Sequence, residues 1–424
     1  MKNNQGRDIY KRSRLLYIIE AALEYFISIT VGGAYLATLT NSLGFTDSLT
    51  GILTSFVSLG CGFQIIAIFL ANKRPVKRWV TILHTLNQLF FAIVYFVPIF
   101  NFNPTAKTVL FILFLLMGHI LNNIVNAPKI NWYMSLVDDK QRGKFTANKE
   151  IISLLGGMLF TFALSAVIDH FKAIGDLKTA LILCGIGIVF LTLAHTCTLL
   201  FSKEKQEEDI VQSNVKETLK GLIKDKNLIK VVLISVFWNI ASYTATPFYG
   251  SYQTKELNFS MTFISVLSII TAIVRSSFSR PMGRYADKYS FSKMLNICFL
   301  LATIAFGVNI FTTPGNGKVL FTIYIVLHAI AMAGINSSVI NLIYDYVEPR
   351  QRTAALALKS ALAGFAGFFT TLIVSPLVDY IQGAGNLIFG ISVYAQQVTS
   401  AIAFVFMILL LVYMNTVIRK IKKR

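Results

Sequence analysis

Two glutamates one helical turn apart, Glu20 and Glu24, lie within the first long apolar segment of the chain. If this segment enters hydrocarbon near Arg14 and rises about 1.5 Å per residue as a helix, Glu24 lies about midway across. A charge at that depth is costly and persists mainly where it faces protein or a wet cavity. Two neighbouring carboxylates there would share protons, which makes them a workable proton-coupling device. The alternative is that Arg or amide partners hold both acids and lock two helices together.

Further apolar segments carry stripes of amides, imidazoles and aromatic rings. The set is His119, Asn122 and Asn126 on the fourth apolar segment, Trp238, Asn239 and Tyr243 on the seventh, and His328 and Asn336 on the tenth. Amides satisfy hydroxyl groups in both directions and rings cover apolar sugar faces, so this set suits a neutral polyhydroxylated solute. No Lys or Arg accompanies these residues at mid-span depth, which disfavours phosphorylated or carboxylated solutes. The alternative is that the polar residues hold helices together.

The elements that position these residues are twelve apolar segments, each about 20 residues long and able to cross roughly 30 Å of hydrocarbon. They begin near positions 15, 48, 79, 107, 147, 177, 228, 259, 291, 318, 353 and 388. Of the 424 residues, 55% are hydrophobic and only 14% are charged, more apolar surface than one soluble core could use. We therefore predict an all-α membrane protein.

The formal net charge of +19 would indicate a nucleic-acid partner in a soluble protein. Here the positive residues are distributed unevenly. If the amino terminus is cytoplasmic, only five of the 39 Lys and Arg residues fall in outer loops. These five are Lys107, Lys172, Lys178, Lys255 and Lys318. Such asymmetry is the positive-inside pattern, so we predict that both termini are cytoplasmic and that the protein binds no nucleic acid.

Residues 137–169 recur in the second half of the chain. Val137, Gln141, Arg142, Ala147, Lys149, Gly157, Thr161, Ser165 and Asp169 reappear as Val347, Gln351, Arg352, Ala357, Lys359, Gly367, Thr371, Ser375 and Asp379. We therefore predict two homologous six-helix bundles, 1–201 and 228–424. The linker 202–227 has Val211, Val215, Leu219 and Leu222 on one face of a short amphipathic helix, which would lie on the inner leaflet or be solvated.

The segment after the eighth apolar stretch carries Gly283, Arg284, Asp287 and Lys288. It resembles the Gly-x-x-x-Asp-Arg/Lys-x-x-x-x-Lys cytoplasmic loop signature of the major facilitator superfamily (MFS). The glycine would permit close helix approach, and the acid and basic residues would pair to close the inward face. The equivalent first-half loop has Ile68 and Asn72 in place of Gly and Asp. A generic basic juxtamembrane loop is the alternative for the single signature.

The resemblance covers essentially the whole chain and implies the MFS fold, two pseudo-symmetric six-helix bundles around a central cavity. It implies that the first, fourth, seventh and tenth helices line this cavity, and that the third, with His84, is peripheral. Glu150 and Arg275 would meet across the halves as a gating salt bridge, or would snorkel independently. Arg142 and Arg352 each follow an acid by four residues, and we assign both to structure or gating.

We predict a secondary transporter that works by alternating access, coupled to protons through Glu20 and Glu24, for a neutral polar solute such as a sugar or oligosaccharide. No phosphate-binding loop, metal-ligand cluster or nucleophile elbow occurs, so we predict no enzyme activity, cofactor or metal. We expect a monomer in the plasma membrane. The competing hypotheses are a proton-coupled efflux carrier for lipophilic or cationic compounds, and a solute sensor that does not transport.

Overall fold

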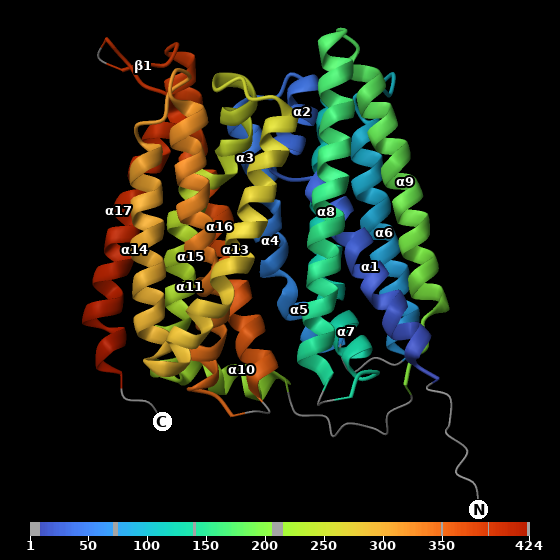
Figure 1. Ribbon diagram of the computed structural model, residues 1–424, viewed down its shortest axis with the longest axis vertical. Coiled ribbons are helices and arrows are strands. Elements are labelled where there is room, and N and C mark those ends of the chain that lie inside the picture. Colours follow the sequence, from blue (N-terminus) through green and yellow to red (C-terminus); the bar gives the residue numbers. More distant parts are fainter. Residues whose placement is uncertain are drawn as a thin grey trace, which may run out of the picture. The chain divides into compact units, whose positions relative to one another are not determined.

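The computed structural model describes residues 9–70, 75–138, 141–205, 215–348, 351–388 and 390–421, and these are almost entirely helical (Figure 1). Within them, eleven helices are long and apolar enough to cross a membrane. The count is twelve if the broken pair Lys11–Thr30 and Gly33–Ser42 forms one span. The prediction of an all-α membrane protein is confirmed.

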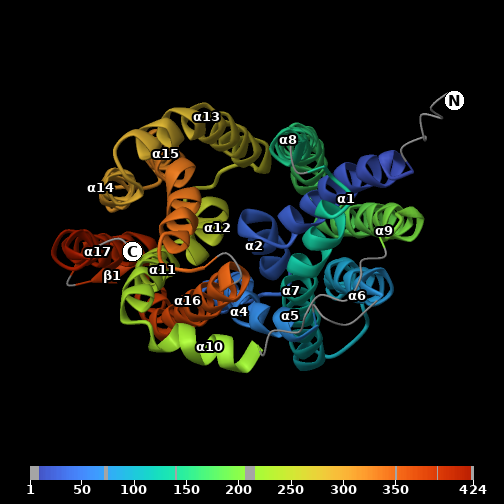
Figure 2. The same ribbon diagram turned by 90° about the horizontal axis from the view of Figure 1, so that it is seen from below.

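Contacts group the chain into two compact units, and the first joins Met1–Val31 to Phe69–Gln212. Its helices are α1 (Lys11–Thr30), α6 (Val76–Phe96), α7 (Pro104–Met134), α8 (Arg142–Ala173) and α9 (Leu177–Phe201). In this unit α6 packs along α7 and α9, and α1 packs along α8 and α9. Viewed end-on in Figure 2, α1, α6, α7 and α9 surround one interior.

The second unit joins Gly32–Ile68 to Ser213–Arg424. Its amino-terminal helices are α2 (Gly33–Ser42), α3 (Asp47–Thr54), α4 (Phe56–Gly62) and α5 (Gln64–Leu70). The later elements are α10 (Val215–Lys224), α11 (Lys226–Ala245), η2 (Thr246–Phe248), α12 (Tyr249–Ser251), η3 (Tyr252–Glu256), α13 (Met261–Lys288), α14 (Phe291–Asn309), α15 (Gly317–Tyr344), α16 (Arg352–Gly383), β1 (Leu387–Ile388), β2 (Ile391–Ser392), α17 (Ala395–Thr416) and η5 (Ile418–Lys420). The predicted division at 1–201, 202–227 and 228–424 follows the repeat and stays a prediction.

The last span begins later than predicted. Strands β1 and β2 pair antiparallel, with Ile388 opposite Ile391, and form a hairpin before α17. Gly390 has φ +77°, a left-handed conformation that favours glycine. The expected start near position 388 was wrong because these residues are apolar but turn back, and α17 starts at Ala395.

The first span is interrupted where α1 ends. The Tyr95 hydroxyl donates to the carbonyl oxygen of Thr30 at 2.7 Å, and the Thr30 hydroxyl donates to the carbonyl of Ile27 at 2.7 Å. These bonds satisfy carbonyl groups at the helix end that lipid could not hydrogen-bond. Gly33, with φ +51°, then restarts the helix.

Small residues bring α3 and α4 against α16 in the second unit. The Ser58 hydroxyl donates to the carbonyl oxygen of Gly364 at 2.9 Å, and the hydroxyls of Ser48 and Ser375 lie 2.6 Å apart. A Cβ atom added at Gly364 would lie 2.8 Å from the backbone nitrogen of Gly62. Lipid-embedded helices associate through such close packing and polar contacts, because lipid tails provide no hydrophobic drive between them.

The linker contains a short helix, α10, whose apolar residues Leu219 and Leu222 are buried. Because α10 contacts α11 and α16, this face packs against protein. The spacing had indicated contact with the inner leaflet or with solvent instead. Of the other residues named for this face, Val211 and the side chain of Val215 lie outside the described part of the chain.

Replacement of Gly364 by leucine should weaken the contact between α4 and α16. The new side chain would meet the backbone of Ser58 and Gly62, so we expect the free energy of unfolding to fall by about 1–3 kcal/mol. The measurement is the apparent melting temperature of the purified protein in detergent. Gly187→Leu is the matched control, because a Cβ atom at this exposed helical position meets no atom within 4 Å. Equal melting temperatures for the two variants would contradict the packing argument.

Candidate functional site

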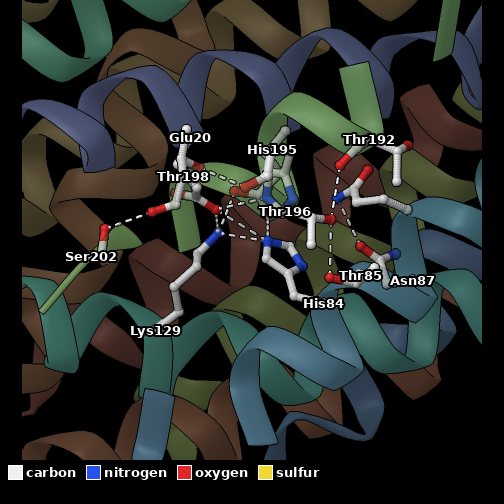
Figure 3. Close-up of polar contacts among 12 residues, drawn as sticks. Glu20, His84, Thr85, Asn87, Lys129, Thr192, His195, Thr196, Thr198 and Ser202 are labelled. Atoms are coloured by element: carbon white, nitrogen blue, oxygen red, sulfur yellow. Dashed lines mark hydrogen bonds and ion pairs between the residues drawn. The ribbon is translucent and has the colours of Figure 1, made fainter. Parts of the chain in front are cut away.

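The first unit contains five titratable residues in mutual contact, Glu20, Glu24, His84, Lys129 and His195, which we call the ionic network. The Lys129 ammonium donates to Glu20 Oε1 at 3.0 Å and to Glu24 Oε2. The Nε2 atoms of His195 and His84 lie 3.0 Å and 3.2 Å from the same Glu20 oxygen. Figure 3 shows Glu20, His84, Lys129 and His195 converging from α1, α6, α7 and α9.

The ionic network is removed from solvent except at Glu24. The side chains of Glu20, His84 and His195 are 0% exposed and that of Lys129 is 2% exposed, whereas Glu24 is 19% exposed. About one turn away, on the side of the α1 amino terminus, each helix contributes a buried apolar or aromatic residue. These are Tyr17, Val80, Tyr133 and Leu199, all members of one cluster. The network is therefore sealed on that side, and Glu24 is its accessible end.

The hydrogen bonds of Lys129 constrain the protonation of His84. A protonated lysine has three N–H donors. Glu20 and Glu24 accept two of them, and the third points at His84 Nε2, 3.1 Å away. His84 Nε2 can accept this bond only when it carries no proton. When it carries one, it must donate instead. Its acceptor is then Glu20 Oε1 at 3.2 Å, whereas Glu24 Oε1 lies 3.6 Å away, beyond hydrogen-bond distance. One nitrogen thus faces two partners that select opposite protonation states.

Glu20, His84 and His195 also present their ligand atoms within 4.8 Å of one another, a spacing that could hold a metal ion. Among the described residues, however, the Lys129 ammonium already lies 3.0 Å from Glu20 Oε1 and 3.1 Å from His84 Nε2. A divalent ion would have to displace this ammonium. The arrangement fits a protein cation better than a metal.

The sequence indicated the two glutamates but not their partners. The expected alternative was Arg or amide partners, whereas a lysine and two histidines hold them. The positive-inside count treats every Lys and Arg except the five outer ones as cytoplasmic, and this places Lys129 in an inner loop. That placement is wrong, because α7 continues to Met134 and buries Lys129. The sequence nevertheless contained a signal for its position. Lys129 is seven residues after Asn122 and three after Asn126, so it lies on the same polar face of the helix.

His84 is likewise buried within the first unit rather than peripheral. Its neighbours Asn87 and Gln88 are buried as well, and the Asn87 amide donates to the carbonyl oxygen of Gly118 at 2.7 Å. The third span therefore directs its polar face to α7. The prediction of a peripheral role for this helix was wrong for these side chains.

The second unit contains a cavity of about 610 Å³. Four residues of the predicted solute site, Trp238, Asn239, Tyr243 and His328, contribute to its wall. The rings of Trp238 and His328 are stacked with centroids 6.1 Å apart, and the Asn239 amide donates to the carbonyl oxygen of Ala363 at 2.7 Å. The wall combines flat rings with hydrogen-bonding groups, as a site for a polar ring-bearing solute would.

The cavity wall also includes residues that the sequence did not single out for solute binding. These are Gly32, Gly33, Thr54, Val57, Ser58, Cys61, Ser242, Thr246, Pro247, Met332, Lys359, Ser360 and Ala363. The presence of Lys359 is a correction, because the argument for a neutral solute rested on the absence of a cation at this level. The sequence did mark this residue in one way, because Lys359 corresponds to Lys149 in the internal repeat.

The other predicted solute contacts lie elsewhere. His119 is 6% exposed and its ring packs 4.9 Å from that of Phe91, between α7 and α6 of the first unit. Asn122 and Asn126 are half-buried on α7. Asn336 belongs to α15, but its side chain is outside the described part of the chain. The described geometry thus brings together the residues of α11 and α15. The α7 residues belong to the first unit, and a shared site with them stays a prediction.

The family model of the Major Facilitator Superfamily matches residues 18–273 and 231–424. This chain belongs to that superfamily. A mutant of the nucleoside transporter NupG is 17% identical, with a TM-score of 0.73 over 95% of this chain and 99% of that one. The D-xylose-proton symporter is 15% identical, with a TM-score of 0.66 over 94% and 97%. No match was found among curated proteins. The resemblance and the predicted fold class are confirmed: the protein is a multi-pass membrane protein with an MFS transporter fold.

The superfamily signature lies on a helix rather than in a loop, because α13 continues to Lys288. Arg284, Asp287 and Lys288 are exposed on its last turns, and the Lys288 ammonium lies 5.3 Å from the ring centroid of Tyr289. A Cβ atom at Gly283 would meet no described atom within 4 Å. A role of this glycine in close helix approach stays a prediction.

The other predicted gating residues are described only in part. Arg352 opens α16 with its guanidinium 4.5 Å from the ring centroid of Tyr344. The side chain of Arg142 lies outside the described residues. Glu150 on α8 and Arg275 on α13 are both exposed and belong to different units, so their salt bridge stays a prediction.

Replacement of Lys129 by methionine should leave Glu20 and Glu24 without their cation. Breaking a buried pair in this way costs about 3–5 kcal/mol of stability, and we expect a corresponding fall in the apparent melting temperature. Adding Glu20→Gln to this variant should recover part of the loss, since one buried charge is then removed. The control is Lys149→Met, whose ammonium lies over the Tyr17 ring at 5.5 Å and contributes about 1 kcal/mol or less. Additive effects of the Lys129 and Glu20 substitutions would rule out their direct coupling.

Proposed function

We propose that this protein is a proton-coupled secondary transporter that moves a small polar solute across the membrane by alternating access. The ionic network carries the proposal, because buried ionisable groups on four membrane helices are costly unless they serve a function. Membership of the superfamily supports the transporter class. We further propose a monomer in the plasma membrane with both termini in the cytoplasm, as the distribution of Lys and Arg predicts.

Charge balance within the ionic network supports proton coupling. Glu20 and Glu24 carry two negative charges when ionised and Lys129 carries one positive charge. With both imidazoles neutral, the network holds one excess negative charge in a site that is almost fully buried. Binding of a single proton removes that excess, so protonation and the electrostatic stability of the closed network are linked.

We assign the mobile proton to the group formed by Glu20, Glu24 and His84 rather than to the carboxylates alone. A neutral His84 that accepts from Lys129 at Nε2 carries its hydrogen on Nδ1. A proton added at Nε2 then forms an imidazolium and places two cations 3.1 Å apart, because Lys129 Nζ lies at that distance. The imidazolium then competes with Lys129 for the same carboxylate oxygens. Protonation therefore weakens the hydrogen bond between Lys129 on α7 and His84 on α6. We propose that this change links proton binding to helix movement.

The solute site is assigned to the cavity of the second unit. Trp238 and His328 offer ring faces, while Asn239 and Tyr243 offer hydrogen-bonding groups. The similar solved structures include transporters for a nucleoside and for D-xylose, both solutes with hydroxylated rings. A sugar-like body fits this wall. The competing hypothesis of an efflux carrier for lipophilic cations is disfavoured here, because Lys359 would repel a cation.

Proton coupling is tested with Glu24→Gln in proteoliposomes. Solutes are first selected by their thermal stabilisation of the purified protein, since a ligand of the native state raises the apparent melting temperature. We expect this variant to lose accumulation driven by an imposed pH gradient, because its accessible carboxylate can no longer exchange a proton. Counterflow exchange should remain largely intact. Unchanged uphill uptake would remove Glu24 from the coupling site.

The role of His84 is tested with His84→Gln, which keeps a hydrogen-bonding side chain but cannot be charged. We expect loss of gradient-driven accumulation and a flatter pH dependence of counterflow, because the substitution removes an ionisable group from the ionic network. His119→Gln is the control, since His119 is also buried but packs on Phe91 outside the ionic network. Equal effects of the two substitutions would assign both histidines to structure alone.

A further inference from the structure

Lys359 is a half-buried cation on the wall of the second-unit cavity. It lies two turns inside α16, which begins at Arg352. Among the described residues no carboxylate forms an ion pair with it, and the cavity wall contains no acidic residue. An uncompensated charge within a membrane span is costly and marks a binding function by default. The ionic network differs in this respect, because its lysine is neutralised within the protein.

The surroundings of Lys359 have the composition of a ligand site. Ser360 follows it on α16, and Ser58 and Cys61 face the cavity from α4. The packing of α4 on α16 fixes this arrangement, since a Cβ atom at Gly364 would lie 3.0 Å from Cys61 Cβ. The same cavity therefore holds a positive charge, hydroxyl groups and the stacked rings of α11 and α15.

We propose that the transported solute carries a carboxylate group, which binds Lys359 while its hydroxylated or ring-shaped body lies against Trp238 and His328. This inference rests on the proposed function, because it takes the cavity as the solute site. A single lysine matches a single negative charge. A phosphate carries more charge and is usually bound by several cations, whereas the described wall supplies a single lysine.

A purely structural role for Lys359 makes a different prediction. A lysine that snorkels toward the end of α16 would present its charge outside the cavity and leave the cavity without a preference for anions. The local potential at Cys61 distinguishes the two cases. It can be measured without knowledge of the solute.

The experiment compares the reaction of Cys61 with two thiol reagents of opposite charge in reconstituted protein. These are sulfonatoethyl methanethiosulfonate, an anion, and trimethylammonioethyl methanethiosulfonate, a cation, each normalised to its rate with mercaptoethanol. The exposed Cys197 is replaced by serine, and Cys61→Ser identifies the signal of interest. We expect Cys61 to prefer the anionic reagent by about tenfold, the size of effect that a nearby charge produces in a partly hydrated site.

The preference should disappear in Lys359→Gln and persist in Lys359→Arg. Lys318→Gln, in the first turn of α15, is the control and should change nothing. Equal normalised rates in the parent protein, no labelling of Cys61 by either reagent, or a preference that survives Lys359→Gln would each overturn the proposal.

Solute pairs that differ by one carboxylate, such as D-glucuronate and D-glucose, separate this inference from the proposed function. We expect the acid to raise the apparent melting temperature more than the neutral partner, and Lys359→Gln to abolish the difference. Proton-coupled uptake confined to neutral solutes would contradict the inference and leave the transporter function intact. Binding of acids without any proton-dependent uptake would contradict the coupled transporter and leave the anion site intact.

Discussion

Charge compensation in a low-dielectric environment is the constraint on which the functional architecture depends. Hydrocarbon offers neither water nor counterions, so each ionised group within a span needs an opposite charge, hydrogen bonds or access to a wet cavity. The two units meet this requirement in different ways. Lys129 is bound by two carboxylates and an imidazole in a site that is almost fully buried. Lys359 has no such partner among the described residues and faces a cavity instead. The first arrangement suits internal proton exchange, and the second suits an external anion.

Backbone packing sets the positions of these charges. In the second unit, Gly364 and Ser58 let α4 and α16 approach closely, and this contact places Cys61 and Lys359 on one cavity wall. In the first unit, aromatic stacking of Tyr17 on Tyr133, with ring centroids 4.2 Å apart, lies directly beside the ionic network. The apolar cluster around this pair excludes water from one side. Glu24, at 19% exposure, is the member of the network that remains accessible.

The number, type and approximate start of the spans could be predicted because hydropathy over about 20 residues is a local property. The prediction failed where a tight turn or a contact with a distant part of the chain overrides local hydropathy. The hairpin before α17 is apolar enough to extend the predicted span, yet Gly390 and the strand pairing turn the chain. The apolar face of α10 packs on α11 and α16, because a buried partner satisfies it better than water. The helical continuation of α13 through Gly283 likewise replaces a predicted loop.

The sequence by itself predicted a membrane protein of about twelve spans with a repeated segment, and it placed Glu20 and Glu24 within the first span, where a charge demands an explanation. Hydropathy, charge asymmetry and residue spacing are sufficient for these conclusions. Only the tertiary structure decided which groups compensate those glutamates. Lys129 lies 109 residues from Glu20, and His195 lies 175 residues away. Their electrostatic coupling depends on distance through space, which helix packing sets and no local sequence pattern encodes. Lys359 is a second example. Only the folded structure places it on the wall of a cavity that has no acidic residue among its described lining.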